Sequence, residues 1–178
     1  MKRIKYIKDL HNLSNDIKQT VKDCEKECKR ISDYIATQDL LFVLGKEDTL
    51  SIAYEGALKI KELTYVNAQG YGGNSLRHGP YAVIKKGTPI IFVSPNNEHM
   101  THMKNTMEEV YSRNAVPICI TDYTGKIPKC DNIIKVKSND SFSGILHNIP
   151  LQLIAYYTAL KLGNTIDKPI NLAKCVSV

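Results

Sequence analysis

The chain has 178 residues, of which 43% are hydrophobic and 24% are charged, and its formal net charge is +6. This length is enough for one domain with a sizeable core, and the composition excludes a disordered or fibrous protein. No apolar run reaches membrane-spanning length and the N-terminus lacks the pattern of a secretory signal. We therefore expect a cytoplasmic protein with no membrane partner.

The positive charge does not by itself indicate a nucleic-acid-binding protein. Basic residues between Lys18 and Asp33 are interleaved with acidic ones, as on a solvated helix surface. The chain has no Trp and only three Phe, so the sequence offers no platform on which bases could stack. We expect no nucleic-acid partner. The net positive charge is compatible with binding a phosphorylated metabolite.

The five cysteines are odd in number and scattered, which argues against a disulfide framework. Cys24 and Cys28 share one face of a predicted helix, but no second Cys or His pair with zinc-site spacing accompanies them. We expect neither a metal nor a cofactor.

Residues 1–37 are predicted to form a long connector helix. Apolar or small residues follow one another at alternating steps of four and three along it, at Ile17, Val21, Cys24, Cys28, Ile31 and Ile35. This spacing gives one narrow seam that must pack on something. The spacing leaves two uses open, packing on the helix's own domain or joining domains or subunits.

From residue 38 to residue 178 the pattern becomes that of an α/β domain. Four apolar runs are predicted strands: LLFVLG at 40–45, TPIIFVSP at 88–95, VPICITD at 116–122 and NIIKVK at 132–137. Three helices are predicted at 51–65, at 96–114 with an asparagine cap, and at 142–163, followed by an extended tail. This alternation predicts a three-layer sandwich whose mainly parallel sheet is covered on both faces.

The predicted helix at 51–65 carries Glu55, Lys59 and Glu62 within about 60° of one another. One interpretation is a solvent-facing ion pair of ordinary i, i+4 spacing. Apolar neighbours indicate instead a helix buried nearly all round, where charges need a polar cleft because desolvating them is costly. Such a cleft would supply general acid and base groups.

The segment after this helix, NAQGYGGNSLRHGP, is predicted to be a glycine-punctuated loop. Gly79 and Pro80 end any helix that begins near Asn74 or Ser75, so His78 should be displayed at a fixed corner. The other four histidines are expected to be ordinary surface residues; they are His11, His99, His102 and His147.

Five segments occur in an order that resembles one known family: EGALKIKEL, LRHGP, SPNNE, NIPLQLIAYYTAL and NLAKCVSV. Together they resemble the C-terminal half of the isomerase domain of glutamine:fructose-6-phosphate aminotransferases, also called glucosamine-6-phosphate synthases. The resemblance covers about residues 40–178, and the preceding helix resembles the family's connector between two sugar isomerase (SIS) domains. It implies a flavodoxin-like topology. It also implies the conversion of fructose 6-phosphate and glutamine-derived ammonia to glucosamine 6-phosphate.

The same resemblance assigns roles to individual residues. Glu62 matches the base that moves the proton between the first two sugar carbons, with Lys59 and Glu55 as its partners in the cleft. Lys174 matches the Schiff-base lysine, next to Ala173 in the substrate site. His78 matches a ring-opening histidine that acts in the neighbouring subunit, which implies a homodimer. These residue types fit the chemistry of the reaction, because moving this proton requires an imine to acidify the C–H bond and a carboxylate to carry the proton.

Two departures limit what the chain should do alone. In the resembled family the sugar phosphate is gripped by Ser/Thr-rich loops of a preceding SIS domain, and glutamine is hydrolysed by a separate domain. We expect this sequence to contain neither, and its own strand ends, VLGKEDTLS and SPNNEHM, lack the dense hydroxyl and glycine donors of a phosphate cradle. We expect inactivity in isolation and the missing domains as partners. A non-catalytic sugar-phosphate-binding or dimerisation module, and an isomerase or deglycase that does not use glutamine, stay open as alternatives.

Overall fold

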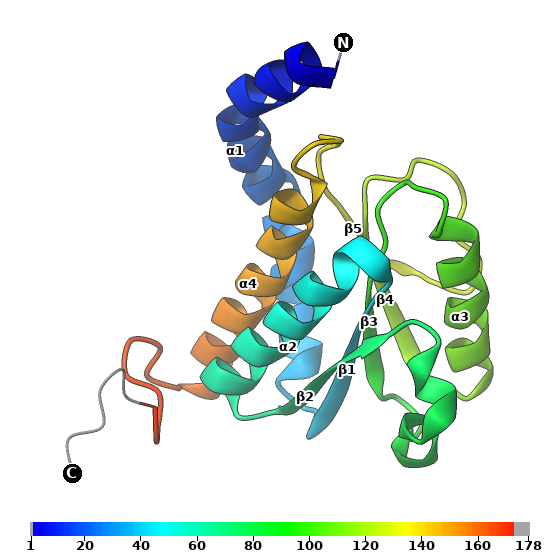
Figure 1. Cartoon of the computed structure of the whole chain (residues 1–178). Helices are drawn as coiled ribbons and strands as arrows, with labels where there is room; N and C mark the ends of the chain where they lie inside the picture. The colour runs from blue at the N-terminus through cyan, green and yellow to red at the C-terminus, as the bar shows by residue number, and fades with distance from the viewer. Residues whose placement is uncertain (1, 173–178) are drawn as a thin grey trace.

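The computed structural model describes residues 2–172 and shows a five-stranded sheet between layers of helices (Figure 1). The strands are β1 (Leu40–Gly45), β2 (Asn67–Gly72), β3 (Pro89–Val93), β4 (Val116–Thr121) and β5 (Asn132–Lys135). The helices are α1 (Lys2–Ile35), α2 (Leu50–Thr64), α3 (Met100–Ser112) and α4 (Ser143–Leu162), with 3₁₀ turns η1 (Glu47–Thr49), η2 (Ser75–His78) and η3 (Pro80–Val83).

The sheet has the order β2-β1-β3-β4-β5, and every neighbouring pair is parallel. This is the flavodoxin-like order, in which the chain reverses direction across the sheet between β1 and β3. The predicted α/β class, parallel sheet and three-layer arrangement are confirmed. Short apolar strands such as LLFVLG produce this sheet because both of their faces are covered.

Two apolar cores flank the sheet. The first lies under α1, α2 and α4, and the second lies under α3 and η2. Phe42 and Leu44 of β1 point into the second core while Leu41 and Val43 point into the first, as the two-residue period of a strand requires. The four predicted apolar strands and the three later helices are therefore confirmed, with boundaries shifted by a few residues.

The seam of α1 packs on its own domain. Cys24, Cys28, Ile31 and Ile35 are buried in the first core. Ser32 donates hydrogen bonds from its hydroxyl to carbonyl oxygens of its own helix and of α4. The N-terminal turns of α1, at the blue end of the ribbon, extend beyond the sheet (Figure 1). Ile4, Ile7 and Leu10 in these turns are exposed.

The prediction of a loop at NAQGYG was wrong, because these residues form β2, the edge strand beside β1. Its glycines allow close packing and do not serve turns. A Cβ at Gly70 would lie 2.9 Å from the Cα of Tyr54 and 3.2 Å from the carbonyl oxygen of Ala53, both on α2. A side chain at that position would therefore push α2 away from the sheet.

Two further predictions about element ends were wrong. α3 begins at Met100, its cap position is His99, and no side chain caps it. Asn97 instead accepts the backbone N–H of His99 in the preceding turn, at 2.9 Å. The tail from Asn164 to Leu172 consists of bends and turns and is not extended. In the segment 2–172, no helix is long and apolar enough to cross a membrane.

Candidate active site

The structure brings the three charged residues of α2 together as the sequence predicts. The Lys59 ammonium donates a hydrogen bond to the Glu62 carboxylate at 2.5 Å, and it lies 4.0 Å from an oxygen of Glu55. The Lys59 and Glu62 side chains are 35% and 28% exposed, whereas that of Glu55 is 50% exposed. Lys59 therefore pairs most closely with Glu62.

The prediction that α2 is buried nearly all round was wrong for this chain. Its buried residues form one face, made of Ala53, Gly56, Ala57, Ile60 and Thr64. Tyr54 and Leu58 are exposed on the opposite side. The charged stripe therefore runs along the border between the buried and exposed faces of α2.

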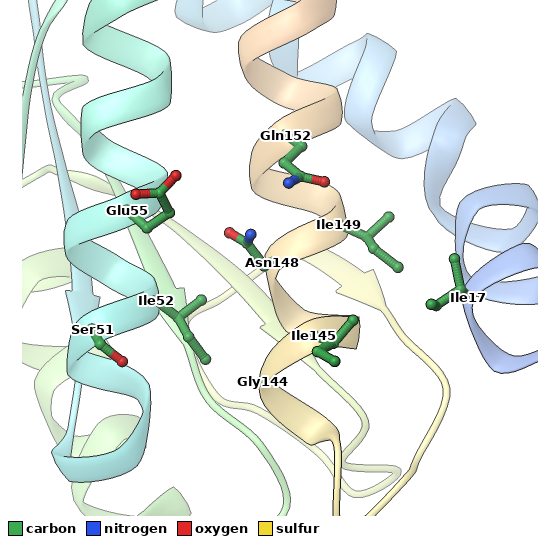
Figure 2. A pocket seen from close by; sticks show the side chains of 9 residues that line it. All are labelled: Ile17, Ser51, Ile52, Glu55, Gly144, Ile145, Asn148, Ile149 and Gln152. Carbon is green, nitrogen blue, oxygen red and sulfur yellow. The ribbon is translucent and has the colours of Figure 1, made fainter. Parts of the chain in front are cut away.

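A groove of about 610 Å³ is lined by α2 and α4 and by Ile17 of α1, which lies on the side of α4 away from α2 (Figure 2). Glu55 reaches into it from α2, and the amide of Asn148 faces it from α4. The amide oxygen of Asn148 is buried and has no hydrogen-bond partner within residues 2–172. Of the charged stripe, only Glu55 lines this groove, so the groove and the Lys59–Glu62 pair are neighbouring but separate features.

The C-terminal tail returns to the end of α2 that carries Glu62. Asn164 donates from its side-chain amide to the carbonyl oxygen of Leu63 at 2.8 Å. The backbone N–H of Ile170 donates to the hydroxyl of Tyr65 at 2.7 Å. These bonds hold residues 164–170 beside the last turn of α2, although Leu172 is 51% exposed. The predicted site residues Ala173 and Lys174 lie outside the described residues.

His78 and Glu62 lie at opposite ends of the parallel strands. It ends η2, which follows the carboxyl end of β2, and its side chain is exposed. α2 runs back from the carboxyl end of β1 to the amino end of β2, so its last turn, with Glu62, lies at the amino ends of the strands. Gly79 has φ +139°, a conformation that favours glycine, and it ends the turn as predicted. Within one chain, the structure does not bring His78 to Glu62.

A second pocket, of about 440 Å³, lies at the carboxyl ends of the strands, where the strand order reverses. Ligands of open α/β sheets commonly bind at this position. Four carboxylates line it, those of Asp48, Glu98, Asp122 and Asp140. The described residues that line it include no basic side chain, and Lys5 reaches only Asp140, at 2.7 Å. The pocket is therefore acidic and poorly suited to a phosphate group.

The prediction that His147 is an ordinary surface histidine was wrong. Its side chain is fully buried on α4. Its Nδ1 lies 2.8 Å from the carbonyl oxygen of Ser143, which can only accept, so Nδ1 carries the proton. Burial lowers the pKa of His147, although the Ser143 carbonyl and the carboxylate of Asp122, 3.7 Å from Nε2, oppose this shift. The buried imidazole thus lies beside Asp122, one of the carboxylates that line the acidic pocket.

The four cysteines within residues 2–172 lie in the two apolar cores. Cys24, Cys28, Cys119 and Cys130 are free and buried. Burial raises the pKa of Cys130 to about 12, which leaves no thiolate at neutral pH. Across residues 2–172, no three His, Cys, Asp or Glu side chains are grouped so that they could hold a metal ion.

Comparisons with known proteins agree with this architecture. The SIS domain family matches residues 34–162. A glutamine–fructose-6-phosphate aminotransferase [isomerizing] from Rhizobium leguminosarum is 34% identical over 176 residues, which cover 97% of this chain and 29% of the relative. The chain therefore spans less than a third of the length of this relative.

Two solved structures share the fold. The C-terminal domain of glucosamine-fructose-6-phosphate aminotransferase from Francisella tularensis superimposes with a TM-score of 0.85 at 30% identity, over 92% of this chain and 47% of that one. A glucosamine-6-phosphate deaminase from Thermotoga maritima superimposes with a TM-score of 0.74 at 27% identity, over 93% of this chain and 48% of that one. In both cases the chain corresponds to about half of the matched structure.

Proposed function

Because the chain belongs to the SIS domain family, we propose that it is the second SIS half of the isomerase unit of a glutamine:fructose-6-phosphate aminotransferase. In that role it would help to convert fructose 6-phosphate and ammonia to glucosamine 6-phosphate. The observation that carries this proposal is the Lys59–Glu62 pair, which lies at the end of α2 where the C-terminal tail is bonded. Lys174 follows two positions after the described residues.

Each member of this group has a chemical role in the proposal. The amine of Lys174 attacks the C2 carbonyl of the open-chain sugar, and water leaves as the imine forms. Ammonia then adds to the same carbon and the Lys174 amine leaves, so that the nitrogen of the C2 imine is now that of ammonia. The imine withdraws electrons and makes a C1 proton acidic, so the Glu62 carboxylate removes it and returns it to C2. Lys59 fixes the Glu62 carboxylate by its hydrogen bond, and Glu55 holds the Lys59 ammonium from the preceding turn.

The place of His78 leads to the proposal of a homodimer. Ring opening needs a proton to reach the ring oxygen as the C2–O bond breaks, and an imidazole can deliver it. His78 is exposed at the carboxyl ends of the strands, whereas Glu62 lies near their amino ends, so His78 is better placed to serve a second copy of the chain. We place this assembly in the cytoplasm.

The acidic pocket supports the proposal that another SIS half, and not this one, binds the phosphate of the sugar. Four carboxylates line the position where a phosphate would bind in many α/β proteins, so phosphate is expected to be held elsewhere. The proposed partners are a preceding SIS half that grips the phosphate and a glutaminase domain that supplies ammonia.

A chimera tests the proposal. Residues 1–178 would replace the matched segment of the Rhizobium leguminosarum relative, and the isomerisation of fructose 6-phosphate would be assayed. We expect an active chimera in which Glu62→Gln lowers kcat by about 10² to 10⁴, the usual contribution of a positioned general base. Glu47→Gln, on the exposed turn η1, is the matched control and should change little. Unchanged turnover in the Glu62 variant would favour the alternative of a non-catalytic binding or dimerisation module.

A further inference from the structure

The turn that contains His78 is hydrogen-bonded to the carboxylate of Glu109 on α3. Glu109 accepts hydrogen bonds from Nε of Arg77 at 3.2 Å and from Nη2 of the same guanidinium. It also accepts from the hydroxyl of Tyr81 at 3.0 Å. Arg77 immediately precedes His78, and Tyr81 follows it by three positions. One acid therefore binds side chains on both sides of the histidine.

Arg113 closes this network from the end of α3. Its guanidinium stacks over the ring of Tyr81, with 4.1 Å between Cζ and the ring centroid. It also donates from Nη1 to the backbone carbonyl of Glu109 at 2.7 Å. Leu76, on the other side of Arg77, is fully buried in the second core. His78 itself is exposed, so its neighbours are fixed while its imidazole is free to face a ligand.

The charge state of Glu109 suits this role. Burial raises the pKa of its carboxyl, but the hydrogen bonds from Arg77 and Tyr81 more than offset this, so the pKa lies below its usual value. A bidentate contact between a guanidinium and a carboxylate also fixes orientation better than a contact to a single ammonium would. The network therefore holds a defined geometry in the ionised state.

We infer that Glu109 is a positioning residue for His78, holding the Arg77–Tyr81 turn so that the imidazole meets the sugar ring at a fixed place and angle. This inference rests on the proposed function, because it assigns Glu109 to the ring-opening step. A displacement of about 1 Å at a catalytic group can cost about 10² in rate, so loosening the turn should be visible in kinetics.

The first arm of the test measures the turn directly in the 178-residue chain. Hydrogen–deuterium exchange of residues 74–83 would be compared among Glu109→Ala, Glu109→Gln and Glu108→Ala. Glu108 is the adjacent, exposed acid on α3 and is the matched control. We expect at least tenfold faster exchange in Glu109→Ala, partial recovery in Glu109→Gln because its amide oxygen still accepts, and no change in Glu108→Ala. Unchanged exchange in Glu109→Ala would overturn the inference.

The second arm measures ring opening in the chimera described above. Glu109→Ala should lower kcat for fructose 6-phosphate by about tenfold to a hundredfold with little change in KM. It should have little effect on 5-deoxyfructose 6-phosphate, which lacks the hydroxyl that closes the furanose ring. His78→Ala should show the same dependence on substrate, and the double variant should lose little more than either single variant. Equal losses on both substrates would mean a merely structural role and would overturn the inference.

The two arms separate the inference from the proposed function. If the chimera isomerises neither sugar, the proposed function fails, and the exchange measurement still decides whether Glu109 holds the turn. If the chimera is active and His78→Ala is silent, the histidine has no role in ring opening and the inference is overturned while the isomerase proposal stands.

Discussion

The ammonium of Lys59 donates a hydrogen bond to the carboxylate of Glu62 at 2.5 Å, across one turn of α2. Both side chains are about one-third exposed, and the C-terminal tail is bonded to the residues on either side of the helix end. An ion pair in this setting is weak as a source of stability, because water competes for both charges. The proposed role of this pair in catalysis therefore makes a measurable prediction.

We expect a small coupling between these two residues in the folding free energy. Lys59→Met, Glu62→Gln and the double variant would be unfolded in urea, and the cycle should give about 0.3–1 kcal/mol, as for other partly exposed helical pairs. Isomerisation by the chimera should fall sharply in both single variants. A coupling above about 2 kcal/mol would indicate that the pair serves the fold.

Lys174 should form a covalent adduct if it is the proposed imine-forming residue. Borohydride delivers hydride to an imine carbon and leaves a stable secondary amine, so reduction in the presence of fructose 6-phosphate should label the chimera. Peptide mass spectrometry would locate the label. Lys174→Met should remove it, and Lys168→Met, on the described part of the tail, should leave it in place. A label at other lysines alone would contradict the assignment.

His147 should make folding stability depend on pH. Its pKa is lowered in the folded state, so between that value and the unfolded value of about 6.5 the unfolded chain binds more protons. Its contribution is therefore complete above about pH 6.5 and is lost as the pH falls, by up to about 1.4 kcal/mol per pH unit. His102, whose pKa is also lowered by burial, adds to the same trend.

Urea unfolding at pH 7.5 and pH 5.5 would measure this loss of stability. The variant His147→Phe should show a smaller difference between the two pH values than the parent chain. His11→Phe, at an exposed position of α1, should keep the parental difference. An identical pH dependence in all three proteins would show that the buried imidazole does not control it.

The close packing of α2 on the edge strand predicts a strong effect at Gly70. A Cβ there meets the backbone of Tyr54 at 2.9 Å, and backbone cannot rotate away, so Gly70→Ala should destabilise the fold by about 1–3 kcal/mol. At Gly72 the nearest atom is the hydroxyl of Ser75 at 3.2 Å, which can change rotamer. Gly72→Ala should therefore cost clearly less in urea unfolding, and equal costs would show that α2 does not restrict β2.

Much of this protein could be predicted from its sequence, because hydrophobic period and charge spacing are local properties. The buried strands read as apolar runs, and the spacing of Glu55, Lys59 and Glu62 placed three charges on one helix face before any packing was known. The same residues at the same spacing supported the resemblance to the aminotransferases. The domain boundaries, the dimer and the roles of Lys174 and His78 stay predictions.

The tertiary structure decided what depends on neighbours far along the chain. NAQGYG has weak strand propensity and becomes β2 only because β1 offers it an open edge, and His147 is buried only because α4 packs on the sheet. The contact of Glu109 with Arg77 spans 32 positions, and the separation of His78 from Glu62 follows from α2 running back across the sheet. Such relationships arise from strand pairing and layer packing, which no local period contains.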